Sequence, residues 1–166
     1  MTAGAESDPR VVAIHQRLES GGATVAVGES LTGGLLGAAL TAVPGASRTF
    51  RGGVIAYATD VKESLLEVPG PLLDAEGAVS AHVAAAMAAG VRDQLAATYG
   101  VALTGVAGPD GQDGNPPGTV FVAVAGPGGG QVRELTLTGD RSAVRVGAVD
   151  AALELLRDLL DGAPRA

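Results

Sequence analysis

Residues 25–62 read VAVGESLTGGLLGAALTAVPGASRTFRGGVIAYATDVK, and the rest of the chain is organised around this stretch. A short apolar run leads into Gly28-Glu29-Ser30, and Gly33-Gly34 then opens an apolar helical segment. A second apolar run ends at Tyr57, and Lys62 follows it. The pattern predicts a strand, a turn that carries the Ser30 hydroxyl, and a helix. Amide groups at such a turn carry partial positive charge and can hold an anion or a developing oxyanion.

The composition predicts one globular domain. A length of 166 residues suits a single domain. Apolar residues make up 46% of the chain but aromatic residues only 2%, so Ala, Val and Leu must fill the core. The 26 glycines follow no collagen-like period and predict many tight turns and close backbone approaches.

Charge and cysteine content exclude several classes of function. The net charge is −7 and the pI about 4.7, whereas nucleic acids and anionic membranes bind clustered Lys and Arg. The chain has no cysteine, which excludes disulfides, thiol nucleophiles and thiolate metal sites. No apolar run reaches the roughly 20 residues of a membrane span, and the acidic N-terminus lacks a signal-peptide core. We therefore expect a cytoplasmic protein that binds neither nucleic acid nor membrane.

Hydrophobic periodicity and turn residues predict alternating helices and strands after a flexible tail at residues 1–8. Helices are predicted at 9–20, 33–43, 60–66, 80–99 and 140–160, with an Asp60–Glu63 capping box and Ser80 as an N-cap. Strands are predicted at 23–27, 50–57 and 101–104, a hairpin at 119–125 and 131–138, a turn at 69–75, and a loop at 105–118. This order predicts a three-layer α/β/α sandwich on a mixed sheet, formed by one domain at residues 9–162.

Five motifs in this order resemble the CinA C-terminal domain family over roughly residues 10–160. They are ESLTGG after the first strand, GGVIAYATDVK after the second, GAVS before the long helix, TGVAGPDG, and PPGTVFVAV. Each motif alone is weak, and five in one order are highly specific. Many family members carry a preceding molybdopterin-binding-like domain. We expect this chain to be the C-terminal unit alone, so the activities of the other domain are not transferred to it.

The resemblance implies a nicotinamide-nucleotide amidohydrolase, which converts nicotinamide mononucleotide to nicotinate mononucleotide and ammonia without a metal or other cofactor. It implies that Ser30 is the nucleophile and that Tyr57 and Lys62 support it. Two departures from the family pattern stand out. Leu31 replaces a common Cys beside the nucleophile, and Ala58-Thr59 replaces a common Ser-Asn pair, which removes an amide that could contact substrate.

Several roles stay open from the residues alone. Ser30 is either a nucleophile or an N-cap, and Thr32 is a second possible cap. Glu29 is a surface or first-turn carboxylate, or it orients Lys62. The position of Lys62 in a first helical turn, together with partial burial, should lower its pKa towards that of a general base. The Tyr57 ring either fills the core or carries a hydroxyl that relays a proton or holds Lys62.

The glycine-rich loop 105–118 is either a flexible surface loop or a phosphate site built from free amides. Arg141 either pairs with Asp140 or faces a substrate phosphate. His15 and His82 are interpreted as surface residues, because neither has a partner at metal-ligand spacing. The expected substrate-binding residues are Thr32, Gly33, Gly34, Thr104, Gly105, Gly108 and Arg141.

The sequence thus predicts a serine amidohydrolase that acts on a small-molecule nucleotide. Lys62 takes the proton of Ser30, amides near Thr32–Gly34 hold the oxyanion, and Lys62 or Tyr57 protonates the leaving ammonia. Two alternatives are a catalytically silent nucleotide-sensing or interaction module, and a hydrolase for another amide or nucleotide. Ala-rich helices that could bury surface against a second subunit favour a homo-oligomer.

Overall fold

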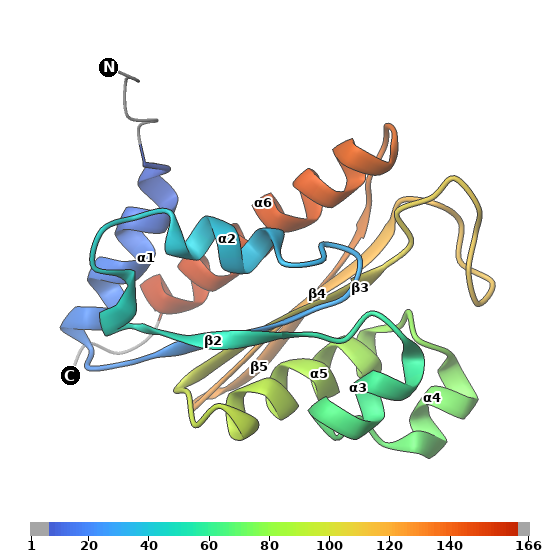
Figure 1. Ribbon diagram of the computed structural model, residues 1–166, viewed down its shortest axis with the longest axis horizontal. Coiled ribbons are helices and arrows are strands. Elements are labelled where there is room, and N and C mark those ends of the chain that lie inside the picture. The colour runs from blue at the N-terminus through green and yellow to red at the C-terminus, as the bar shows by residue number, and fades with distance from the viewer. Residues whose placement is uncertain (1–6, 163–166) are drawn as a thin grey trace.

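The computed structural model describes residues 7–162, which form a five-stranded mixed sheet between two layers of helices (Figure 1). The predicted tail at residues 1–8 lies mostly outside the described residues. The strands are β1 (Val25–Glu29), β2 (Phe50–Ile55), β3 (Tyr99–Gly105), β4 (Thr119–Gly126) and β5 (Gly129–Thr136). The helices are α1 (Pro9–Ser20), α2 (Leu35–Thr41), α3 (Thr59–Leu66), α4 (Gly70–Glu76), α5 (Ala81–Gln94) and α6 (Arg141–Gly162), with a 3-10 turn, η1 (Ala46–Arg48).

The sheet order is β2-β1-β3-β4-β5. Strand β1 is parallel to both β2 and β3, while β3–β4 and β4–β5 are antiparallel. The chain passes from β1 to β2 on one side and later returns to β3 on the other side of β1. The carboxyl end of β1 is therefore a topological switch point, the place where ligands bind in open α/β sheets.

Two apolar cores lie on opposite faces of the sheet, as the predicted three-layer sandwich requires. Helices α1, α2 and α6 cover one face and α3, α4 and α5 cover the other (Figure 1). All residues of β1 are buried, as expected for a continuous apolar strand with neighbours on both sides. Helices α3 and α5 approach each other closely at Gly90. A Cβ at this position of α5 would collide with the Leu66 carbonyl at the end of α3. This approach fixes α3, which carries Lys62, against α5.

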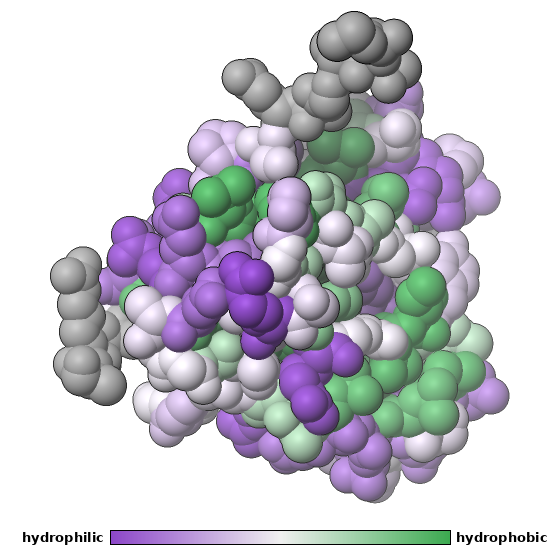
Figure 2. Space-filling view, turned by 60° about the vertical axis from the view of Figure 1, so that its left-hand side comes forward, coloured by the Kyte–Doolittle hydropathy of each residue, from purple (hydrophilic) through white to green (hydrophobic). Residues whose placement is uncertain are grey.

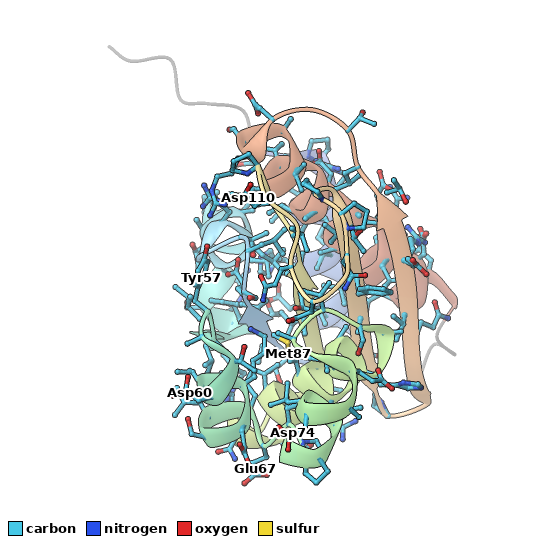
Figure 3. All side chains as sticks on the ribbon, turned by 90° about the vertical axis from the view of Figure 1, so that its right-hand side faces the viewer. Tyr57, Asp60, Glu67, Asp74, Met87 and Asp110 are labelled. Atoms are coloured by element: carbon cyan, nitrogen blue, oxygen red, sulfur yellow. The ribbon has the colours of Figure 1, made fainter. Side chains whose placement is uncertain are left out.

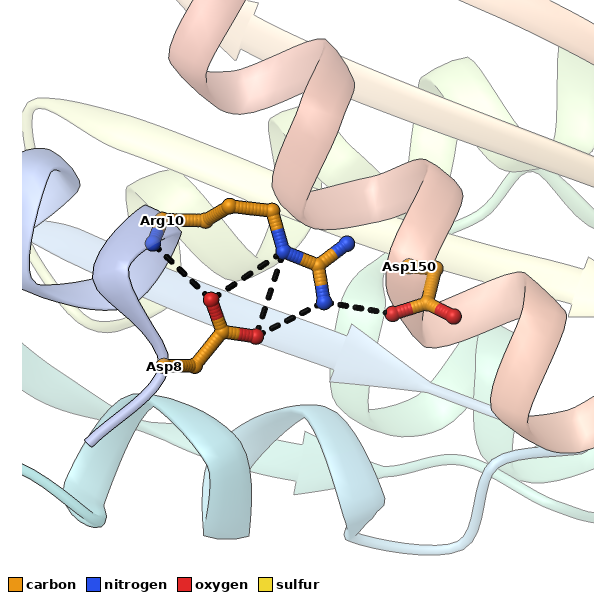
Figure 4. Close-up of polar contacts among 3 residues, drawn as sticks. All are labelled: Asp8, Arg10 and Asp150. Atoms are coloured by element: carbon orange, nitrogen blue, oxygen red, sulfur yellow. Dashed lines mark hydrogen bonds and ion pairs between the residues drawn. The ribbon is translucent and has the colours of Figure 1, made fainter. Parts of the chain in front are cut away.

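The start of α1 is tied to α6 at the surface (Figure 4). Asp8 caps α1 by accepting from the Arg10 amide over 2.8 Å, and the Arg10 guanidinium lies between Asp8 and Asp150, at 2.7 Å from each. The guanidinium beside Asp8 holds the pKa of that carboxyl below its usual value. Ion pairs as exposed as these contribute little to the free energy of unfolding. Their main effect is to orient the start of α1 against α6.

The structure corrects several predicted boundaries. Residues 70–76 form helix α4, where a turn was predicted, because Pro71 stands in the first turn and needs no amide partner there. Helix α5 ends at Gln94 and Tyr99 already belongs to β3. The capping box is also wrong, since α3 begins at Thr59 and no side chain caps it. The predicted cap at Ser80 is confirmed by its bond from the Val83 amide, 3.1 Å long.

His15 is buried, which corrects its interpretation as a surface residue. Its ring bonds the Thr49 hydroxyl and, at 2.7 Å, the Leu40 carbonyl, so it links α1 to the last turn of α2 and to the residue before β2. His82 is exposed, as expected, and lies 2.7 Å from Glu76. None of the helices in the described part of the chain combines the length and apolarity needed to cross a membrane.

The surface in Figure 2 mixes apolar and polar residues, with green patches among the purple ones. Large apolar side chains are exposed on several elements and at the junction of β2 with α3, namely Leu35, Ile55, Tyr57, Leu65, Val132 and Val146. Leu35 lies on the first turn of α2, Ile55 ends β2 and Tyr57 follows it, all near the carboxyl end of β1. That end carries the candidate site.

Candidate active site

Ser30 follows the last residue of β1 and lies at the switch point of the sheet. Its amide donates to the Leu103 carbonyl over 3.2 Å, which extends the pairing of β1 with β3 by one residue. On the other side, the Ala56 amide donates to the Glu29 carbonyl over 2.8 Å. The two neighbouring strands therefore fix the backbone on which the Ser30 hydroxyl is presented.

Glu29 holds the first turn of α2. Its carboxylate is 2% exposed and accepts from the Thr32 hydroxyl and from the amides of Gly34, Leu36 and Gly37, over 2.7–3.2 Å. Neither Ser30 nor Thr32 caps this helix, which corrects both capping hypotheses. Glu29 is a buried residue of β1, which corrects the expectation of a surface or first-turn residue, and it bonds no atom of Lys62. The Ser30 hydroxyl is thereby left for another partner.

That partner is Lys62, whose Nζ lies 3.0 Å from Ser30 Oγ. The amine also donates to the carbonyls of Ala56 and Tyr57, over 2.8 and 3.3 Å, and the side chain is 1% exposed. Lys62 is the only lysine in the sequence, where every other strongly basic side chain is an arginine. Burial lowers the pKa of Lys62 to about 8, against a smaller opposing effect of the Asp113 charge. The chain's single lysine is thus hydrogen-bonded to a serine and shifted towards neutrality.

A cavity of about 120 Å³ opens beside this pair. Figure 3 looks onto this end of the molecule, with Tyr57 and Asp110 labelled. The cavity wall combines the pair with loop backbone and a few polar side chains: Ser30, Leu31, Tyr57, Lys62, Ala78, Gly105–Gly108, Asp110–Gln112 and Arg141. The wall is therefore formed by the carboxyl ends of β1 and β3, the segment from β2 into α3, the turn before α5, the start of α6 and the glycine-rich loop.

Tyr57 and Arg141 meet at the mouth of the cavity. Tyr57 is 59% exposed, which excludes the interpretation of its ring as core. Its hydroxyl accepts from Arg141 Nη2 over 2.9 Å, and Arg141 Nη1 donates to the Gly108 carbonyl over 2.8 Å. Arg141 faces the cavity and makes no ion pair with Asp140 among the described residues. The carbonyl of Tyr57, and not its hydroxyl, is the group that holds Lys62.

Loop 105–118 is anchored, which decides against a freely flexible segment. The Asp113 carboxylate accepts from the Ala78 amide over 2.9 Å, and Asn115 Nδ2 donates to the Val79 carbonyl over 3.1 Å. The Thr104 hydroxyl donates to the Ala78 carbonyl over 2.6 Å. Asp113 brings its negative charge near Lys62 while it holds the loop in place.

The structure divides the expected substrate-binding residues into two groups. Gly105, Gly108 and Arg141 line the cavity together with Ser30, Tyr57 and Lys62. The other four, Thr32, Gly33, Gly34 and Thr104, are not among the lining residues. The Gly33 amide donates to the Ser30 carbonyl over 3.1 Å, and the Gly34 amide donates to Glu29. These two amides are therefore occupied, which corrects their assignment as oxyanion donors.

Sequence reasoning missed two residues of the site, Asp113 and Arg145. Arg145 donates to the carbonyls of Leu31 and Thr32, directly after Ser30. Its spacing of four from Arg141 on a helix was the signal that could have found it. No comparable signal marks Asp113. Within residues 7–162, no group of three or more His, Cys, Asp or Glu side chains is placed to hold a metal ion.

The sequence profile of the CinA C-terminal domain family matches residues 8–160. A CinA-like protein of Frankia casuarinae is 58% identical over 142 residues, which are 86% of this chain and 33% of the relative. A CinA-like protein of Synechococcus is 52% identical over 158 residues, covering 93% of this chain and 38% of the relative. The chain thus spans about a third of the length of these curated relatives.

Solved structures match over nearly their whole length. The competence damage-inducible protein A from Klebsiella pneumoniae has a TM-score of 0.90 at 30% identity, covering 94% of this chain and 98% of that chain. The competence/damage inducible protein from Agrobacterium tumefaciens has a TM-score of 0.83 at 32% identity, covering 93% and 96%. The three-layer architecture of the chain is that of these proteins.

Proposed function

This chain belongs to the CinA C-terminal domain family, and we propose that it is a nicotinamide-nucleotide amidohydrolase with a serine nucleophile and a lysine base. The observation that carries the proposal is the buried contact between Lys62 Nζ and Ser30 Oγ, 3.0 Å long, at the edge of a cavity. A serine needs a base within hydrogen-bond reach to act as a nucleophile, and a buried lysine near neutrality meets that need.

The lowered pKa sets the active form of the pair. At pH 7, a lysine whose pKa is about 8 is neutral in roughly a tenth of the molecules, whereas an ordinary lysine is neutral in fewer than about one in a thousand. In the neutral form the hydrogen bond reverses, so that the Ser30 hydroxyl donates to Nζ. Activity should therefore rise with pH through about 8.

Acylation follows from this arrangement. Lys62 Nζ accepts the Ser30 proton as Oγ forms a bond to the carboxamide carbon, and the carbonyl oxygen becomes an oxyanion. When the intermediate collapses, the C–N bond breaks and Lys62 returns the proton to the leaving nitrogen, so that ammonia departs. Water then repeats the sequence: Lys62 takes its proton, hydroxide attacks the ester carbon, and the proton returns to Ser30 Oγ.

The size of the cavity supports a substrate that enters only in part. Its volume of about 120 Å³ is well below the roughly 300–1,000 Å³ of pockets that enclose a drug-sized ligand. We assign the cavity to the carboxamide end of the substrate and the mouth to the rest of the nucleotide. The exposed Tyr57 ring offers an aromatic face there. Arg141 offers a guanidinium that can exchange its present carbonyl and hydroxyl partners for phosphate oxygens.

The test is ammonia release from nicotinamide mononucleotide by the purified protein, with Ser30→Ala as the matched variant. The proposal expects turnover by the wild type and none by a folded Ser30→Ala protein. Binding of the nucleotide without ammonia release would contradict it and favour a sensing module. Turnover of a different amide, with nicotinamide mononucleotide untouched, would keep the serine chemistry and overturn the substrate.

A further inference from the structure

Two arginines one turn apart on α6 reach the candidate site in different ways. Arg141 contacts the mouth of the cavity, whereas the half-buried Arg145 contacts only the backbone of the turn that follows Ser30. Arg145 Nε donates to the Leu31 carbonyl over 2.9 Å, and Nη2 donates to the Thr32 carbonyl over 3.1 Å. One planar guanidinium thus holds two consecutive peptide groups, which a lysine cannot do with the same geometry.

These bonds determine which amides around Ser30 are free. In a trans peptide the N–H points away from the C=O of the same unit, so fixing the Leu31 carbonyl also fixes the Thr32 amide. The bond from the Gly33 amide to the Ser30 carbonyl fixes the Leu31 amide in the same way. Within residues 7–162, neither the Leu31 nor the Thr32 amide has a hydrogen-bond partner, while the Gly33 and Gly34 amides are occupied.

We propose that Arg145 is a positioning residue that keeps the Thr32 amide available as an oxyanion donor of the Ser30 reaction, beside the Leu31 amide that the Ser30–Gly33 bond already fixes. Leu31 lines the cavity, and its amide belongs to the residue directly after the nucleophile. Donors held in place before the reaction stabilise the oxyanion without reorganisation. The inference rests on Ser30 as the proposed nucleophile and does not depend on which amide is cleaved.

Removal of Arg145 should slow the chemistry and leave substrate binding nearly intact. Without the guanidinium, the Leu31 carbonyl loses its partner and the Thr32 amide loses its fixed direction, whereas the Thr32 carbonyl still accepts from the Leu35 amide over 3.1 Å. Loss of one oxyanion donor typically lowers kcat by about 10²–10³-fold. KM should change little, because the interaction develops in the transition state. Arg145→Lys keeps the positive charge but loses the planar pair of donors, so its kcat should lie between those of Arg145→Ala and the wild type.

The experiment measures Ser30 reactivity with an alkyl fluorophosphonate alongside ammonia release. In the labelling step, Ser30 Oγ forms a bond to phosphorus, the P–F bond breaks, fluoride leaves, and Lys62 takes the serine proton. The phosphoryl oxygen then needs the same donors as an amide oxyanion. The matched control is Arg51→Ala on β2, because Arg51 also donates to a backbone carbonyl, that of Leu95 over 2.9 Å, away from the cavity. Thermal unfolding checks that each variant is folded.

The outcomes separate this inference from the proposed function. We expect Arg145→Ala to label about 100-fold more slowly, with partial recovery in Arg145→Lys and no change in Arg51→Ala. The same pattern in a protein that releases no ammonia would overturn the substrate and support the inference. Labelling of a folded Arg145→Ala protein within about threefold of wild type would overturn the inference, since a donor effect of this kind is about 10²-fold or more. A wild type that does not label at all would overturn both.

Discussion

Two buried ionisable side chains, Glu29 and Lys62, lie next to Ser30, and their hydrogen-bond partners differ in kind. The Glu29 carboxylate accepts from one hydroxyl and three amides. The Lys62 amine donates to one hydroxyl and two carbonyls, and no ion pair involves it among the described residues. Glu29 has donors at the start of a helix, where the peptide dipoles favour negative charge. Lys62 has only neutral acceptors.

The difference distinguishes a structural charge from a reactive one. Glu29 builds the turn that presents Ser30, and its bonds keep α2 in register with β1. Lys62 is desolvated, and the Asp113 charge compensates for this only in part, so the pKa of Lys62 falls to about 8 and its charged and neutral forms lie close in free energy. A group poised in this way can exchange a proton at working pH, which is why such shifts gather at functional sites.

The largest expected effect comes from removing the proton-accepting ability of Lys62. Lys62→Arg keeps a positive charge but stays protonated at working pH, so it should lose about 10²–10⁴-fold in turnover, as should Lys62→Met. The rate of ammonia release measures the loss. Arg133→Lys on β5 is the control, because it exchanges the same two residue types away from the cavity and should leave turnover unchanged. If Lys62→Arg kept most of the activity, Lys62 would act through charge alone and the comparison with Glu29 would fail.

Neutralising the other buried group, Glu29, should lower the stability of the fold more than it lowers the rate of the reaction. Glu29→Gln removes the charge and turns one acceptor oxygen into a donor that faces amide donors. We expect a loss of about 2–4 kcal/mol in the free energy of unfolding, measured by chemical denaturation. Glu134→Gln, on the exposed strand β5, serves as the control and should change little. A variant as stable as wild type would show that the first turn of α2 does not depend on the carboxylate.

The smallest effect is expected at Asp113, whose charge raises the pKa of Lys62 against the lowering by burial. Asp113→Asn retains an oxygen that accepts from the Ala78 amide and removes only the charge. The pKa of Lys62 should then fall further, and the rising limb of the pH–rate profile should move to lower pH by less than about one unit. Asp74→Asn on α4 is the matched control. A shift to higher pH would contradict the assigned sign.

The sequence predicted most of the fold because its signals were local. The continuous apolar run before Glu29, the glycine hairpin and the Ser80 cap each act within a few residues. The pair of Ser30 and Lys62 was predicted through the family motifs, 32 residues apart in the chain and 3.0 Å apart at their reactive atoms. Helix α4 was missed because Pro69-Gly70-Pro71 is typical of a turn, although proline also suits the first turn of a helix.

The rest of the site depends on contacts that no local pattern encodes. Arg145 reaches back 114 residues to the Leu31 carbonyl, and Asp113 reaches 35 residues back to the Ala78 amide. Both bonds form only once α6 and the glycine-rich loop have packed at the carboxyl end of β1. The role of Glu29 could not be predicted either. Its burial and its four hydrogen-bond donors show that it stabilises the start of α2 and does not pair with Lys62, and neither feature can be read from the sequence.

Burial holds Lys62 close to neutrality, and because Lys62 is the only lysine in the sequence, its pKa can be measured directly. Protein labelled with ¹³C and ¹⁵N only in lysine gives one side-chain amine to follow by NMR as pH is raised. We expect a titration midpoint of about 8, unchanged in a folded Ser30→Ala protein because burial causes the shift. A midpoint near the ordinary lysine value of about 10.4 would contradict it, because the amine would then be fully charged at neutral pH and unable to accept the serine proton.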